Sequence, residues 1–166
     1  MVARVLKHLF LPPWRLGTAF PRSTLDAIEV AIKASESRHS AELRFVIETS
    51  LPVLEVMRGK SSRHRAVEVF GRMRVWDTEE NSGVLIYVLL AEHRLEIVAD
   101  RGLAKRVEQR EWDAISRDML AAYAQGQFLQ GSVAGIEAIT GLLERHFPPG
   151  ASNPNELPDR PVLLKR

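Results

Sequence analysis

The stretch that decides the fold is residues 83–90, Gly-Val-Leu-Ile-Tyr-Val-Leu-Leu. After the glycine, every side chain in this run is apolar or aromatic, which predicts a central strand buried on both faces. Residues 91–93 follow as a short polar turn. Leu95, Ile97 and Ala99 then stand at every second position. This period of two predicts another strand, which returns beside the first as an antiparallel hairpin.

A third strand is predicted upstream, at residues 42–48, where Leu43, Phe45 and Ile47 again stand at every second position. Between this strand and the run at 83–90, residues 66–73 carry apolar side chains at helical spacing. A strand–helix–strand connection crosses over right-handed and makes its two strands parallel. The sheet should therefore combine a parallel pair with an antiparallel hairpin.

Apolar side chains at helical spacing also predict helices over residues 23–38, 112–123 and 133–143. The resulting order is helix, strand, helix, strand, strand, helix, helix. It predicts an α/β fold, an α/β/α layered single domain whose small mixed sheet is covered by helices.

We expect three segments: an N-terminal lead at 1–22, the domain at 23–147 and an extended tail at 148–166. The last apolar residues, Val162 to Leu164, either dock on the domain or belong to a disordered end.

Composition excludes several classes of protein. The 166 residues contain no cysteine and carry a formal net charge of +2, so disulfides and thiolate metal sites are excluded and nucleic-acid binding is not expected. The longest apolar run has eight residues, against the roughly 18 that a membrane-spanning helix needs. The N-terminus lacks the pattern of a signal peptide. These features predict a cytoplasmic protein.

The predicted topology brings three acidic segments to one edge of the sheet, where the two parallel strands begin and the last strand ends. Carboxylate and amide oxygens on turning loops suit calcium or another divalent cation, and Gly83 and Gly102 would permit the turns. The candidate ligands are Glu42, Asp77, Glu80, Asn81 and Asp100. The alternative is that these side chains only cap helices, solvate loops or pair with arginines such as Arg101.

The opposite edge of the sheet has a rival, basic site. It follows the end of the first strand and could hold phosphate or another anion near the start of the next helix. Its residues are Arg58, Lys60, Arg63 and Arg65. The alternative is an ordinary solvated basic loop. No catalytic motif stands out anywhere in the chain, so a nucleophile cannot be named.

Residues 70–87 (FGRMRVWDTEENSGVLIY) and 96–102 (EIVADRG) together resemble the central block of the TPM domain family. Residues 41–44 (AELR) resemble the opening strand of that family. The resemblance implies an α/β/α layered domain. It also implies possible functions, because some relatives bind calcium and a thylakoid relative is linked to photosystem repair and acid phosphatase activity.

Three hypotheses follow for the function. The first is an accessory or interaction domain that binds a divalent cation and an unknown protein partner. The second is a metal-assisted acid phosphatase. The third is a peripheral scaffold that touches a membrane surface through its basic N-terminus and tail.

Overall fold

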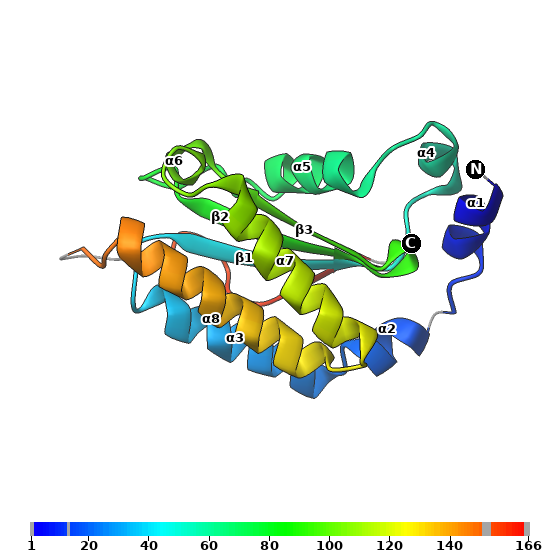
Figure 1. Cartoon of the computed structure of the whole chain (residues 1–166), viewed down its shortest axis with the longest axis horizontal. Coiled ribbons are helices and arrows are strands. Elements are labelled where there is room, and N and C mark those ends of the chain that lie inside the picture. Colours follow the sequence, from blue (N-terminus) through cyan, green and yellow to red (C-terminus); the bar gives the residue numbers. More distant parts are fainter. Residues whose placement is uncertain (1, 13, 151–153, 165–166) are drawn as a thin grey trace.

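The computed structural model describes residues 2–12, 14–150 and 154–164. Its centre is a four-stranded sheet in the order β3-β2-β1-β4 (Figure 1). The strands are β1 (Glu42–Glu48), β2 (Gly83–Leu89), β3 (Arg94–Ala99) and β4 (Val162–Leu164). Strands β1 and β2 are parallel, and β2 and β3 are antiparallel. The mixed sheet predicted from the sequence is therefore confirmed.

Helices cover both faces of the sheet, as the α/β/α prediction requires. On one face lie α3 (Arg22–Glu36), α7 (Gln109–Ala124) and α8 (Phe128–His146), and on the other lies α5 (Ser62–Arg72) (Figure 1). The alternation of side chains along each strand separates the two cores. Phe45 and Ile86 belong to the core under α3, α7 and α8, whereas Val46 and Tyr87 belong to the core under α5.

The tail docks on the sheet. Strand β4 pairs in parallel with β1, with Val46 opposite Val162. Of the two alternatives for residues 162–164, docking is therefore the one observed. The predicted lead (1–22) and tail (148–166) also contain residues 1, 13, 151–153 and 165–166, which lie outside the described part of the chain.

The N-terminal lead forms two short helices, α1 (Val2–Leu9) and α2 (Trp14–Ala19). Helix α1 lies against α4 (Val53–Met57) and the 3-10 turn η1 (Leu90–Glu92). These elements occupy one end of the long axis, and the short helix α6 (Arg101–Ala104) lies near the other end (Figure 1). Among the described residues, none of the helices combines the length and the apolar composition that spanning a bilayer requires.

Candidate cation site

The edge where β1 and β2 begin and β3 ends brings Glu42 and Asp100 into one row. Glu42 is paired with Gly83, and the Asp100 amide donates to the Gly83 carbonyl at 2.9 Å. Two strand spacings of about 4.8 Å separate the two acidic residues across the row. Both side chains belong to the α5 face, because each lies at an even spacing from a residue of that core, Val46 or Val98.

Asp100 has one oxygen in use and one without a partner. Its Oδ1 accepts from the backbone N–H of Arg101 at 2.7 Å, which caps the start of α6. Its Oδ2 is buried and has no hydrogen-bond partner among the described residues. A buried carboxylate oxygen without a hydrogen bond destabilises the folded state, because it has lost its hydration and no protein donor replaces the water.

Backbone carbonyl groups lie close to this edge. The carbonyl oxygen of Val75 would be 1.8 Å from a Cβ at Gly83, and those of Glu80 and Asn81 would be 2.8 and 2.5 Å from a Cβ at Gly102. The sequence predicted that both glycines permit turns that bring carbonyl groups inward, and loop carbonyl groups do lie at both glycines, although neither has a positive φ. They are needed because the loop backbone approaches them too closely for a side chain.

The loop between α5 and β2 is itself tightly wound. Arg74 and Asn81, near its two ends, have φ values of 54° and 52°. This left-handed region is uncommon for residues with side chains, and asparagine tolerates it best. The two turns direct the carbonyl groups of the loop toward the start of β2 and the end of β3.

The other four predicted ligands each have a partner. Glu42 Oε2 accepts from the Leu157 amide at 2.9 Å, and Glu80 accepts from the Ser40 hydroxyl at 2.7 Å. Asn81 Oδ1 accepts from Arg101 Nε at 2.9 Å, and exposed Asp77 pairs with Arg74 at 2.7 Å. Within the described residues, no group of three or more histidines and acids is arranged to hold a metal. A cation would therefore draw on Asp100 and backbone oxygens first.

Sequence reasoning missed the tail as part of this edge. The guanidinium of Arg44 donates to the carbonyl of Pro158, and the carboxyl groups of Glu36 and Glu42 lie near that of Asp159 in the tail. Burial, with smaller contributions from the two neighbouring acids, raises the pKa of Glu36 to about 8, although the Leu43 amide opposes this. Burial likewise raises the pKa of Glu42. No local pattern in the sequence signals a contact between residues as far apart in the chain as Arg44 and Pro158.

His39 joins α3 to α8 just before β1. Because the Ala41 amide donates to Nδ1 at 3.2 Å, the ring proton is on Nε2, which donates to Ser35 Oγ at 2.8 Å. Ser35 then donates to Thr140 Oγ1 at 2.6 Å, and Thr140 donates to the Ile136 carbonyl. Burial lowers the pKa of His39 to about 4, so the folded protein holds this ring neutral.

A change in stability with pH is expected from His39. As pH falls below 6.5, the unfolded chain gains a proton that the folded chain takes up only near pH 4. The contribution of His39 to the free energy of unfolding should fall by about 2 kcal/mol between about pH 7.5 and pH 5. Urea unfolding of the native protein and of His39→Gln should show that difference. His64→Gln, at an exposed position, should keep the native pH dependence, and an identical slope in His39→Gln would contradict the assignment.

The predicted anion site is largely occupied by the protein's own carboxylates. Lys60 pairs with Glu68 at 2.6 Å and also contacts Glu55, while Arg65 pairs with Glu48 at 2.8 Å. Arg63 donates to the carbonyl of Ile97 at 2.6 Å. An anion would have to compete with these contacts, so its binding stays a prediction that rests mainly on exposed Arg58.

The structure thus defines a class: a small α/β domain with acidic loops and a strained turn gathered at one edge of a mixed sheet. The family model for the TPM domain matches residues 17–142. The chain belongs to the TPM domain family.

A solved structure supports the same fold. It is the NMR structure of the BA42 protein from the psychrophilic bacterium Bizionia argentinensis, which is 29% identical and superposes with a TM-score of 0.75. The match covers 85% of this chain and 92% of the BA42 chain. No curated protein matches the sequence.

Proposed function

We propose that this TPM domain protein is a non-catalytic accessory domain that binds a divalent cation, calcium in the first place, and an unknown protein partner. The observation that carries the proposal is the buried Oδ2 of Asp100, which has no hydrogen-bond partner among the described residues. A cation beside this oxygen would supply the missing interaction. The remaining candidate ligands are Glu42, Asp77, Glu80 and Asn81.

The chemistry of the available donors favours calcium. It takes carboxylate and carbonyl oxygens in irregular arrangements, whereas magnesium demands near-octahedral geometry and retains water. Asp100 supplies the charge, and the carbonyl groups of Glu80 and Asn81 lie close to Gly102, whose amide donates to the latter at 3.1 Å. If the acidic side chains that now have protein partners also bound the ion, the calcium affinity would rise, because it depends mainly on the number of charged ligands.

Replacing Asp100 with asparagine should weaken calcium binding by about tenfold or more. Asparagine also caps helices, so the bond to the Arg101 amide is retained while the charge is removed. The measurement is a calcium titration followed by heteronuclear NMR. In the native protein, we expect the amides of Asp77, Asn81 and Asp100 to shift.

The matched control for this titration is Asp118→Asn on α7, which removes an exposed carboxylate and should leave the affinity unchanged. The cation proposal is wrong if millimolar calcium shifts no amide at this edge. It is also wrong if Asp100→Asn binds as tightly as the native protein.

The enzymatic alternative is a metal-assisted phosphatase that uses the same edge. An aspartate can attack phosphorus or hold a metal that activates water, and Asp77 and Asp100 would be the residues concerned. Release of phosphate from an aryl phosphate by the native protein, and its loss in Asp77→Ala/Asp100→Ala, would favour catalysis. Equal rates in the two proteins would reject it.

A further inference from the structure

Helix α1 is attached to the domain by its polar face. The Arg4 guanidinium donates to Glu92 at 2.6 Å and contacts the Lys60 carbonyl. Buried His8 lies 2.7 Å from Glu92 and accepts from the Leu51 amide at 3.0 Å. An amphipathic helix on a globular protein ordinarily packs its apolar stripe on the core and exposes its polar side chains. Here the orientation is reversed.

Most of the apolar stripe of α1 consequently faces outward, and only Val5 packs against the core. Val2 is 73% exposed, and Leu6 and Leu9 are close to half exposed. The chain then continues through Phe10 at 70% and Trp14 at 71% exposure. Side chains of this size are seldom left in water together, because each forgoes about 1.5–3 kcal/mol of burial.

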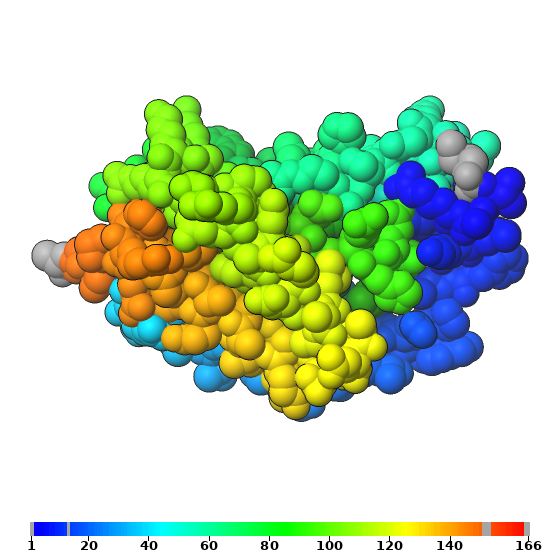
Figure 2. Space-filling view, viewed as in Figure 1, coloured from blue at the N-terminus to red at the C-terminus, as the bar shows by residue number. Residues whose placement is uncertain are grey.

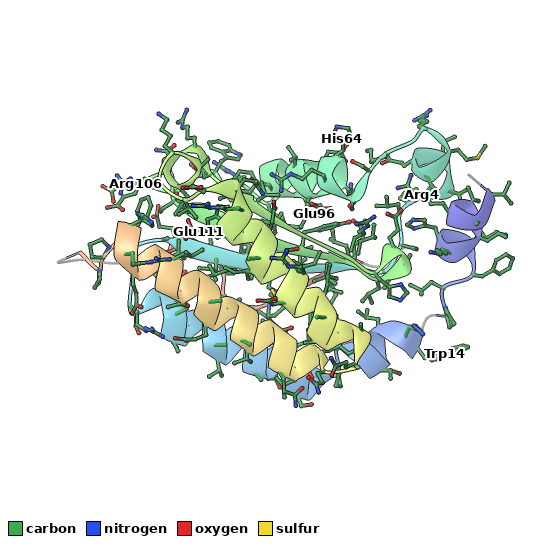
Figure 3. All side chains as sticks on the ribbon, in the orientation of Figure 1. Arg4, Trp14, His64, Glu96, Arg106 and Glu111 are labelled. Atoms are coloured by element: carbon green, nitrogen blue, oxygen red, sulfur yellow. The ribbon has the colours of Figure 1, made fainter. Side chains whose placement is uncertain are left out.

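Helix α4 extends the same surface. It packs against α1 and exposes Leu54 and Met57 by 57% and 59%. Figure 2 shows the segments of α1, α2 and α4 together at one end of the molecule, and Figure 3 shows Trp14 pointing away from the domain there. We call this surface the apolar end. Its residues are Leu6, Leu9, Phe10, Trp14, Leu54 and Met57.

Basic side chains surround the apolar end. Exposed Lys7 lies on α1, Arg15 on α2 and Arg58 just after α4, and Arg94 lines the same cavity as Arg15. None of these four makes an ion pair within the described ranges 2–12, 14–150 and 154–164. The acidic groups nearby are already neutralised, since Glu92 is paired with Arg4 and Glu55 with Lys60. Positively charged side chains therefore surround the apolar end.

We propose that the apolar end docks on the surface of an anionic lipid bilayer. Tryptophan and phenylalanine would enter the boundary between headgroups and acyl chains, and the surrounding lysine and arginines would contact lipid phosphates. A second copy of the chain fits less well. A two-fold dimer through this surface would bring the basic groups of both copies, Lys7, Arg15, Arg58 and Arg94, into one interface, where like charges repel.

The candidate cation site takes no part in this docking, because it lies at the opposite end of the long axis of the molecule (Figure 1). Docking should therefore be independent of calcium. Binding should also weaken as salt is added, because the attraction between the basic residues and the lipid surface is screened over a Debye length.

The test is co-sedimentation of the full chain with vesicles of phosphatidylcholine alone and of phosphatidylcholine mixed equally with phosphatidylglycerol, at low salt in the presence of EDTA. We expect binding to the anionic vesicles only. Lys7→Glu/Arg15→Glu should weaken it by about tenfold or more, since each charge near the surface contributes substantially. Trp14→Ser should weaken it by about tenfold and should abolish quenching of tryptophan fluorescence by brominated acyl chains.

Two matched variants at other positions control for net charge and for loss of a tryptophan. Lys105→Glu/Arg117→Glu reverses two exposed charges, one just after α6 and one on α7, and Trp76→Ser removes a half-exposed tryptophan. Both should bind like the native protein. Equal loss in control and test variants overturns the proposal, as does no binding of the native protein. Sedimentation velocity showing a dimer that Trp14→Ser dissociates would instead assign this surface to a second copy.

Discussion

Replacing Gly83 with alanine is expected to destabilise the domain by more than about 3 kcal/mol, at the upper end of what overpacking costs. The added Cβ would lie 1.8 Å from the carbonyl oxygen of Val75. This obstacle is backbone rather than a flexible side chain, and the Val75 amide is itself bonded to the Phe70 carbonyl at 3.1 Å. The α5–β2 loop would have to leave the sheet to make room.

Thermal unfolding measures this effect, and the midpoint should fall by about 10 °C or more. The control is Gly141→Ala in α8, where a Cβ would meet nothing within 4 Å. Alanine is the better helix former, so this variant should gain about 0.5–1 kcal/mol. A Gly83→Ala protein as stable as the native one would show that the loop does not pack on β2 as described. A calcium titration of Gly83→Ala would test separately whether the candidate cation site survives the change.

Replacing Arg65 with methionine is expected to cost about 3–5 kcal/mol, because it leaves a buried carboxylate without its cation. Arg65 Nε and Nη2 each donate to Glu48 at 2.8 Å, and the Glu48 side chain is only 6% exposed. The hydroxyl of Tyr87 also donates to Glu48, at 2.5 Å. Burial, aided by the carboxylate of Glu48, raises the pKa of Tyr87 well above its usual range, so that hydroxyl keeps its proton.

Denaturant unfolding of a second arginine variant gives the comparison. Arg38 also donates to two carboxylates, those of Glu144 and Glu137, at 2.7–3.0 Å, but its side chain is 40% exposed. Solvent screens such pairs, so Arg38→Met should unfold close to the native midpoint. Arg65→Met should unfold at a much lower denaturant concentration. Similar midpoints for the two variants would mean that Glu48 is hydrated when Arg65 is absent.

Much of the fold could be read from periodicity. The run at 84–90, the alternation at 42–48 and 95–99, and the right-handed crossover predict a mixed sheet. They also predict that Glu42 and Asp100 share an edge, and the observed register places both beside Gly83. The direction of neighbouring strands follows from connection geometry, which local sequence controls.

The site could be read only in outline. The sequence indicated which loops meet, but it did not reveal that Glu80 and Asn81 have side-chain partners while Asp100 keeps an unpartnered oxygen. It also did not reveal how closely the loop backbone approaches Gly83 and Gly102. Their positions require space for a neighbouring backbone, and that neighbour is known only once the chain has folded.

The sequence by itself determined the layers of this TPM domain and the edge at which its acidic loops gather, because hydrophobic period and strand connection are local properties. Tertiary structure alone decided three other features. It placed the tail over Glu42 and Arg44, joined His39 and Ser35 to Thr140, and turned most of the apolar stripe of α1 outward. Each depends on contacts between residues far apart in the chain, or on which face of a helix finds a partner, and neither is encoded in any short segment.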